Sequence, residues 1–186
     1  MYAFKNKISF FYFLIIIISV TTPACKSHKE LTSTDNSTSE NKNNSAPKKL
    51  KAKYANLLGV SEDQITNAKL YTFIDDWYGT PYKYGGSSKN GIDCSNFTCT
   101  LYKEAFDKKL SGTSSSIYNQ CKVVSVSNLE EGDLVFFKID KDEVSHIGVY
   151  LQNNKFVHAT TKKGVMIDDL NEAYYKKYFF KAGKIK

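Results

Sequence analysis

The pattern of apolar and polar positions divides the chain into three stretches. An unbroken apolar run covers residues 10–18. Residues 26–53 then carry mostly Lys, Ser, Thr, Asn and Glu, so they cannot bury enough surface to offset the entropy of ordering. Apolar residues return with regular spacing only after this stretch. We therefore expect a leader over residues 1–24, a flexible tether over 25–56 and one folded domain over 57–186.

The folded part begins with two helical patterns. Ser61 and Gln64 have the spacing of a capping box, and apolar residues then recur at helical spacing until Gly79. This predicts one continuous helix. Asp93 precedes a second helical pattern over residues 94–106 and is placed to cap it.

Short β-rich runs make up the rest of the chain. Each run is bounded by Gly, Asn or Asp, which is typical of strands joined by turns. The runs cover residues 134–139, 145–151, 155–160, 165–167 and 178–182. Helices followed by successive short strands predict an α+β domain, an antiparallel sheet with helices packed on one face.

The first 24 residues are typical of an export signal. Two lysines precede the apolar run, and Ala24-Cys25 follow it. The run is shorter than the roughly 18 residues of a membrane-spanning helix, although a short membrane anchor is the alternative. A small residue directly before cysteine resembles the lipobox of bacterial lipoproteins, which implies that Cys25 is lipidated and holds the protein at a membrane. Threonine and proline before Ala24 are uncommon in lipoboxes, which leaves a secreted form open.

Most of the formal charge of +7 lies outside the folded part. Residues 54–186 hold 17 Lys against 16 acidic residues, whereas residues 26–53 hold seven Lys against three, and the chain has no Arg. A protein that reads nucleic acid would carry basic charge on its folded surface. We therefore expect no nucleic-acid partner. The basic tether is interpreted as a solvated spacer, with contact to anionic lipid or wall polymer as the alternative.

Cysteine and histidine are scarce enough in the domain to be considered one by one. Cys94 stands at a predicted helix N-terminus, where the helix dipole and unpaired N–H groups favour the nucleophilic thiolate. His146 and His158 lie on two predicted strands, twelve residues apart. One cysteine and two histidines can supply a nucleophile, a base and an orienting group. Purely structural roles, or a Cys-His-His zinc site, are the alternatives.

The predicted hairpin between the two histidine strands provides a geometric test. Side chains alternate faces along a strand, so a two-residue turn would place His158 on the opposite face from His146. A three-residue loop over residues 152–154 with Asn154 in the left-handed region, or a bulge, would bring both rings together. We predict such an odd loop.

Five short motifs follow one another along the domain. They are Gly79-Thr80-Pro81-Tyr82-Lys83-Tyr84-Gly85-Gly86, Gly91-Ile92-Asp93-Cys94-Ser95, Glu131-Gly132-Asp133-Leu134-Val135-Phe136-Phe137, Ser145-His146-Ile147-Gly148-Val149-Tyr150 and Phe156-Val157-His158-Ala159. In this order and approximate spacing, they closely resemble the motifs of the NlpC-type cell-wall cysteine endopeptidases. The resemblance implies a papain-like α+β fold and hydrolysis of peptide bonds in peptidoglycan stem peptides.

The resemblance also implies roles for individual residues. Cys94 matches the nucleophile, His146 the general base and His158 the group that orients this base. Tyr82 matches a tyrosine whose hydroxyl helps to stabilise the oxyanion, and Ser95 is assigned to the oxyanion and substrate-binding part of the site. No metal or cofactor is implied.

One departure from the family pattern is Asn96, which stands where Gly is usual; its side chain could narrow the cleft. A disulfide between Cys99 and Cys121 is left open, since an oxidising compartment permits one. We expect a monomeric, lipid-anchored cysteine endopeptidase in the bacterial cell envelope, facing the periplasm or the exterior. A catalytically weak peptidoglycan-binding lipoprotein and a thiol acyltransferase or amidase are the alternatives.

Overall fold

A computed structural model describes residues 48–139 and 142–186. The predicted export signal, the lipidation site Cys25 and most of the predicted tether lie outside these residues. Within the described ranges, no helix has the length and apolar character needed to cross a membrane.

Helices come first along the chain and most strands follow, as predicted for an α+β domain. The elements are α1 (Lys48–Leu58), the 3-10 helix η1 (Glu62–Gln64), α2 (Ala68–Trp77), β1 (Ser87–Ser88), β2 (Gly91–Ile92), α3 (Cys94–Phe106), α4 (Ser114–Asn119), β3 (Cys121–Val124), the 3-10 helix η2 (Val126–Asn128), β4 (Leu134–Phe137), β5 (His146–Tyr150), β6 (Lys155–Thr160), β7 (Gly164–Asp169), α5 (Ala173–Tyr178) and β8 (Phe179–Ile185).

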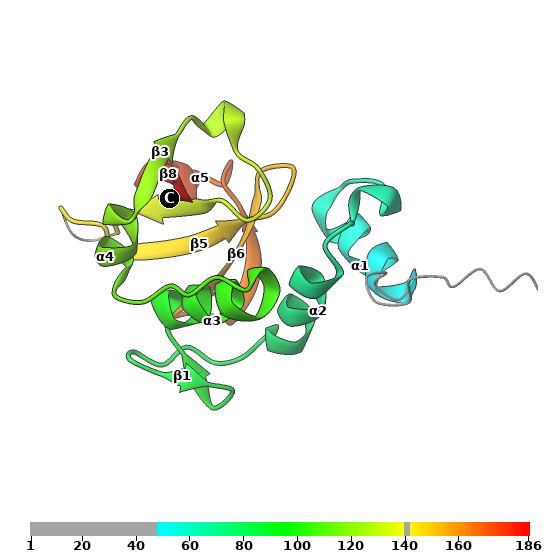
Figure 1. The fold of residues 1–186 in the computed structure, drawn as a ribbon, viewed down its shortest axis with the longest axis horizontal. Coiled ribbons are helices and arrows are strands. Elements are labelled where there is room, and N and C mark those ends of the chain that lie inside the picture. Colours follow the sequence, from blue (N-terminus) through cyan, green and yellow to red (C-terminus); the bar gives the residue numbers. More distant parts are fainter. Residues whose placement is uncertain (1–47, 140–141) are drawn as a thin grey trace, which may run out of the picture. The chain divides into compact units, whose positions relative to one another are not determined.

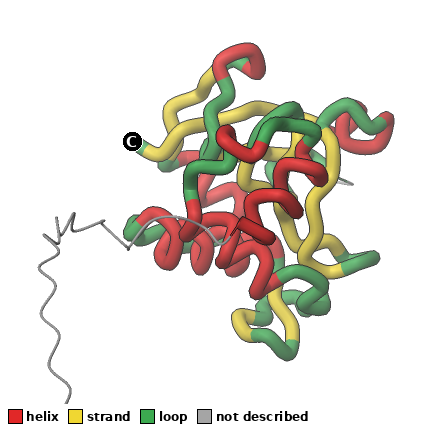
Figure 2. The backbone as a smooth tube through the Cα atoms, turned by 90° about the vertical axis from the view of Figure 1, so that its right-hand side faces the viewer, coloured by secondary structure: helices red, strands yellow, loops and turns green. Residues whose placement is uncertain are grey.

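The centre of the domain is an antiparallel six-stranded sheet in the order β3-β8-β4-β5-β6-β7. Helix α3 packs against β5 and β6, and α2 packs against α3 (Figure 1). In the view from the side of α1 and α2, helices lie in front of the strands (Figure 2). Helix α3 is therefore the element that faces the two strands carrying His146 and His158.

Strand β4 is buried on both faces, which explains its continuous apolar sequence. Leu134 and Phe136 belong to the larger core with α3, whereas Val135 and Phe137 belong to a smaller core with Tyr175 of α5. Side chains alternate between the faces of a strand, so each pair fills a different core. The sheet is thus covered on both faces rather than on one, because the short helix α5, missed by the sequence pattern, packs on the second face.

Two predicted boundaries near the start of the domain were wrong. The expected single helix after Ser61 is divided into η1 and α2, because Asn67 Oδ1 accepts the Leu70 N–H (3.1 Å) and starts a new helix. The predicted tether ends too late, because α1 already belongs to the folded part. Tyr54 and Leu58 in α1 are fully buried.

The β5–β6 hairpin has the three-residue loop that was predicted. Tyr150 pairs with Phe156, and the Leu151 N–H donates to the Lys155 carbonyl (2.9 Å), which leaves residues 152–154 as the loop. Both asparagines of this loop have positive φ, 50° and 59°, a conformation that Asn tolerates better than most residues. The prediction had placed only the second of them in this region.

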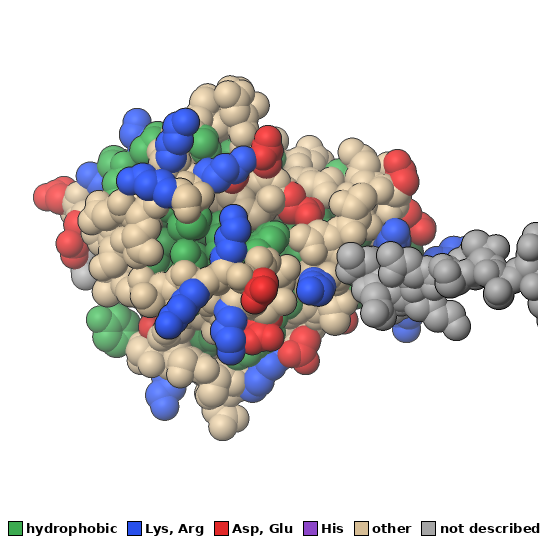
Figure 3. Space-filling view, viewed as in Figure 1, with side chains coloured by type: hydrophobic (Ala, Val, Ile, Leu, Met, Phe, Trp, Pro, Cys, Tyr) green, Lys and Arg blue, Asp and Glu red, His purple; other side chains and the backbone are tan. Residues whose placement is uncertain are grey.

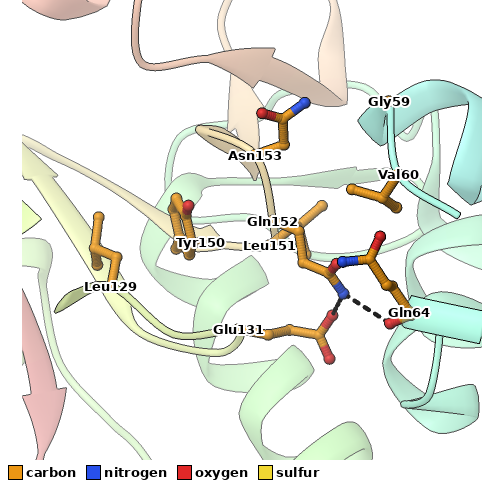
Figure 4. A pocket seen from close by; sticks show the side chains of 9 residues that line it. All are labelled: Gly59, Val60, Gln64, Leu129, Glu131, Tyr150, Leu151, Gln152 and Asn153. Atoms are coloured by element: carbon orange, nitrogen blue, oxygen red, sulfur yellow. Dashed lines mark hydrogen bonds between the residues drawn. The ribbon is translucent and has the colours of Figure 1, made fainter. Parts of the chain in front are cut away.

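This loop is fixed by hydrogen bonds to the helical side of the domain. Gln152 Nε2 donates to the Gln64 carbonyl (3.0 Å) and to Glu131 Oε2 (3.0 Å), as Figure 4 shows. Asn153 Nδ2 donates to the Leu58 carbonyl (2.8 Å). The residues around these bonds line an open hollow of about 500 Å³. The loop that sets the β5–β6 register is therefore attached to the helices rather than free in solvent.

Candidate active site

Cys94 is the first residue of α3, as predicted. The Asp93 side chain caps this helix, with Oδ1 accepting the Asn96 N–H (2.8 Å). Asp93 Oδ2 also accepts the Gly85 N–H (2.9 Å), and Asp93 is only 8% exposed. One carboxylate therefore fixes both the helix start that carries Cys94 and the glycine loop before it.

The Cys94 thiol lies in a buried polar pocket. Sγ is 3.6 Å from Ser114 Oγ, and the backbone N–H groups of Ile147 and Ser95 also face the sulfur. Burial raises the pKa of the thiol; the Ser114 hydrogen bond opposes this rise, and the Asp93 carboxylate adds to it. The net shift therefore favours the protonated thiol, which is the opposite of the direction expected from the helix N-terminus alone. Burial outweighs the helix N-terminus here.

His146 and His158 are brought together by the hairpin register. Val149 of β5 pairs with Val157 of β6, so the next pair in the same register is Gly148 with His158. Gly148 lies two residues after His146 on β5, so His158 and His146 are on the same face of the sheet. His146 Nε2 lies 2.7 Å from His158 Nδ1. The ring nitrogen of His146 that remains for a second partner is Nδ1. The strand then continues directly to Ile147, whose N–H faces the Cys94 sulfur.

A carboxylate and a phenol extend this pair. His158 Nε2 lies 2.9 Å from Asp168 Oδ2 on β7, and the Tyr175 hydroxyl of α5 donates to the same oxygen. Neither residue was predicted from the sequence, because the predicted strand ended at residue 167 and α5 was not predicted. Ser114 was missed because no helix was predicted over residues 114–119; Thr113, whose Oγ1 accepts the Ser116 N–H (3.2 Å), is the capping signal that could have indicated it.

Burial and the negative charge of Asp168 determine the protonation of His146 and His158. Burial lowers the pKa of His146 well below its usual value, and nearby His158 lowers it further, whereas Asp168 opposes the shift. Burial also lowers the pKa of His158, against the hydrogen bond to Asp168. Burial acts to raise the pKa of Asp168, yet the hydrogen bonds from His158 and Tyr175 hold it below its usual value. Both imidazoles are therefore neutral at neutral pH, beside an ionised carboxylate.

A cleft of about 620 Å³ opens over the two histidines. Its lining includes Tyr82, Ser145, His146, His158, Thr160, Met166, Asp168, Glu172 and Tyr175. Burial raises the pKa of Tyr82, and the nearby Cys94 adds to the rise. The Tyr82 phenol therefore favours its protonated form at the cleft, close to Cys94.

Two other residues singled out from the sequence have local roles. Ser95 Oγ donates to Asp93 Oδ1 (2.9 Å), so its hydroxyl supports the helix cap. Asn96 Nδ2 donates to the Gly86 carbonyl (3.0 Å) and to Asp93 Oδ2 (3.2 Å). The Asn96 side chain thus ties the glycine loop to α3, and it is not part of the cleft lining.

The remaining cysteines form no disulfide within the described residues. Cys94, Cys99 and Cys121 are all free, and Cys121 Sγ donates to the Ile117 carbonyl (3.3 Å). In the same part of the chain, no group of three His, Cys, Asp or Glu side chains is arranged to hold a metal ion.

The fold and site together define a papain-like α+β protein, with a cysteine at a helix N-terminus and two histidines in contact on an antiparallel sheet. The chain belongs to the NlpC/P60 family, whose model matches residues 79–184. Among curated proteins, it is 38% identical over 136 residues to the murein DD-endopeptidase MepS/murein LD-carboxypeptidase of Escherichia coli, covering 69% of this chain and 72% of that protein.

Two further relatives support this assignment. The chain is 38% identical over 127 residues to the probable endopeptidase NlpC of Escherichia coli, covering 68% of this chain and 82% of that protein. A solved NlpC/P60 family protein from Bacillus cereus is 29% identical, with a TM-score of 0.58. That match covers 63% of this chain and 39% of the solved chain, so this chain corresponds to about two fifths of that larger protein.

Proposed function

We propose that this chain is a cysteine endopeptidase of the bacterial cell envelope that hydrolyses peptide bonds in peptidoglycan stem peptides or crosslinks, with Cys94 as the nucleophile. Its family membership and relatives named as murein endopeptidases support the substrate class. The observation that carries the mechanism is the 2.7 Å contact between His146 Nε2 and His158 Nδ1, because it leaves His146 Nδ1 as the base for the thiol.

The first chemical step is transfer of the thiol proton. His146 Nδ1 accepts the Cys94 proton as the sulfur attacks a stem-peptide carbonyl, so the S–C bond forms and the carbonyl π electrons move to oxygen. In this mechanism the backbone N–H groups at the start of α3 and the Tyr82 hydroxyl stabilise the oxyanion; the support is the position of Cys94 at the helix start and the nearness of Tyr82 to it. Burial shifts both groups toward their uncharged forms, so the thiolate and the imidazolium are expected to form as the proton is transferred.

The second step releases the amine, and the third releases the acid. When the carbonyl re-forms, the C–N bond breaks and protonated His146 donates its proton to the leaving nitrogen. Neutral His146 then takes a proton from water, whose oxygen attacks the thioester, and the thiol departs with that proton. His158 holds the His146 ring in one orientation throughout.

The chain is further proposed to act from a lipid anchor at Cys25. The supporting observation is the lipobox-like Ala24-Cys25 after an apolar run with two lysines before it. The 22 residues between Cys25 and Lys48 could reach about 70 Å at about 3.3 Å each. That length would let a membrane-held domain contact nearby wall.

On the face shown in Figure 3, basic and acidic side chains are interspersed rather than gathered in one basic patch.

Mass spectrometry of purified peptidoglycan fragments tests the catalytic proposal. We expect the wild-type chain to produce cleaved fragments and Cys94→Ala to produce none, while the control Cys99→Ala keeps at least half of the wild-type rate. Persistent cleavage by Cys94→Ala would contradict the assignment of the nucleophile. Binding of fragments without cleavage by the wild type would favour the peptidoglycan-binding alternative.

The anchoring proposal needs a separate experiment. We expect the wild-type chain expressed in bacteria to fractionate with membranes and to carry a lipid mass on its N-terminal peptide. Cys25→Ser should lose both the lipid mass and the membrane association. An unmodified N-terminus on the wild-type protein would support the secreted form.

A further inference from the structure

We propose that Asp168, held by Tyr175, is a positioning residue that fixes the proton arrangement of both histidines and thereby makes His146 a base at Nδ1. The proposal rests on the function proposed above and adds to it a group beyond Cys94, His146 and His158. It is based on a continuous series of hydrogen bonds from β7 to β5. In each of them, only one of the two atoms can be the donor.

The direction of each hydrogen bond follows from the carboxylate. Ionised Asp168 can only accept, so at 2.9 Å the proton between it and His158 must be on His158 Nε2. Neutral His158 then has a bare Nδ1, which can only accept. At 2.7 Å the proton between the rings must therefore be on His146 Nε2. The lone pair of neutral His146 is left on Nδ1, the nitrogen needed to take the thiol proton.

Burial and packing hold the carboxylate in this role. The side chains of His158 and Asp168 are 1% and 11% exposed, so water competes little for their contact. The Tyr175 hydroxyl donates to the same Asp168 oxygen and lies 3.4 Å from His158 Nε2. The Phe156 and Tyr175 rings pack against the His158 ring, with centroids 4.6 and 5.3 Å away. The His158 ring therefore cannot turn over without breaking several contacts.

The charges around His158 come from three elements besides its own strand. Asp168 on β7 and Glu172 before α5 favour the protonated form, the neutral His146 lies on β5, and Tyr175 is an uncharged donor. Lys163, on the turn between β6 and β7, favours the ionised form of Asp168. When His146 becomes protonated during the reaction, Asp168 is therefore the largely shielded negative charge that stabilises the imidazolium through His158.

Replacement of Asp168 by Asn in the full chain separates this role from simple packing. Asn is isosteric, but its amide can also donate to His158 Nε2 and so select the wrong tautomer. We expect kcat to fall by at least about tenfold with KM nearly unchanged, and the acid limb of the kcat/KM profile to move to lower pH, because losing the negative charge makes His146 less basic. The matched control is Asp169→Asn, since Asp169 pairs with Lys155 (2.8 Å) and should leave both quantities near wild type.

A tautomer measurement tests the proposal without using activity. In ¹⁵N-histidine NMR spectra of the wild-type chain near pH 7.5, both rings should show the Nε2–H tautomer, and Asp168→Asn should shift at least one ring toward Nδ1–H. A predominantly Nδ1–H ring in the wild type would overturn the proposal, even if Asp168→Asn does not fold. Wild-type kcat and pH profile in folded Asp168→Asn would also overturn it. Cleavage that survives Cys94→Ala would instead reject the underlying function.

Discussion

The two halves of the active site are held in place by different kinds of contact. The nucleophile half consists of α3 and the glycine loop before it, and its fixing hydrogen bonds join Gly85, Gly86, Asp93 and Asn96, within about a dozen residues of one another. The base half joins β5, β6, β7 and α5 through side chains that are up to 29 residues apart. Loss of one helix cap can therefore disturb the nucleophile half, whereas the base half depends on the register between its strands.

Shortening the β5–β6 loop should have the largest effect, because it acts on the register of the base half. Deletion of Asn154 would leave a two-residue turn and move His158 to the opposite face of the sheet. We expect the cleavage rate to fall by at least about a thousandfold, measured on peptidoglycan fragments. Asn154→Gly is the control, because Gly accepts the positive φ of 59° and should keep wild-type activity. If the deletion variant kept a tenth of the wild-type rate, β5 and β6 would have paired in another register that still brings both histidines to one face.

Removing the cap should weaken the nucleophile half. Asp93→Ala loses the acceptor for the Asn96 and Gly85 N–H groups, and we expect the free energy of unfolding to fall by about 2 kcal/mol in urea titrations. Ser95→Ala removes only the Oγ bond to Asp93 and should cost less than about 1 kcal/mol. If Ser95→Ala instead lowered the cleavage rate more than tenfold at unchanged stability, the hydroxyl would contact substrate directly.

Acid should destabilise the base half selectively, since the described histidines both lie there. The folded-state pKa values of His146 and His158 are lowered, so below the unfolded-state value near 6.5 the unfolded chain binds more protons. Stability is then fully present above that pH and is lost as pH falls toward the folded-state values. We expect the free energy of unfolding to drop by about 1–2 kcal/mol between pH 7.5 and 5.5. The variant His146→Gln should show a smaller drop, and an equal drop would assign the effect to other groups.

Apart from the control substitution Ser95→Ala, the smallest effect is expected at Asn96. Asn96→Gly restores the residue usual in the resembled family but removes the bond to the Gly86 carbonyl and adds backbone freedom to α3. We expect a loss of about 1 kcal/mol in thermal or urea unfolding, with kcat/KM within about threefold of wild type. A tenfold rise in kcat/KM would instead show that the Asn96 side chain obstructs substrate.

Local chemistry explains why the nucleophile half could be predicted from sequence. An Asp one residue before a helical pattern is a cap whose acceptor and donors lie within a few residues, so the start of α3 at Cys94 followed directly. The odd hairpin loop was also predictable, because only an odd loop or a bulge puts His146 and His158, which were expected to act together, on one face of the sheet. The thiol pKa was not predictable, because its direction depends on how deeply the folded chain buries Cys94.

By itself, the sequence determined the α+β class, the start of the nucleophile helix and the pairing of the two histidines. These depend on periodicity, capping and turn chemistry, which act over short separations. Only the tertiary structure decided that Asp168 and Tyr175 complete the base half, that Ser114 contacts the thiol and that α1 belongs to the folded part. Those contacts join segments whose distance depends on sheet order and helix packing, so no local pattern in the chain encodes them.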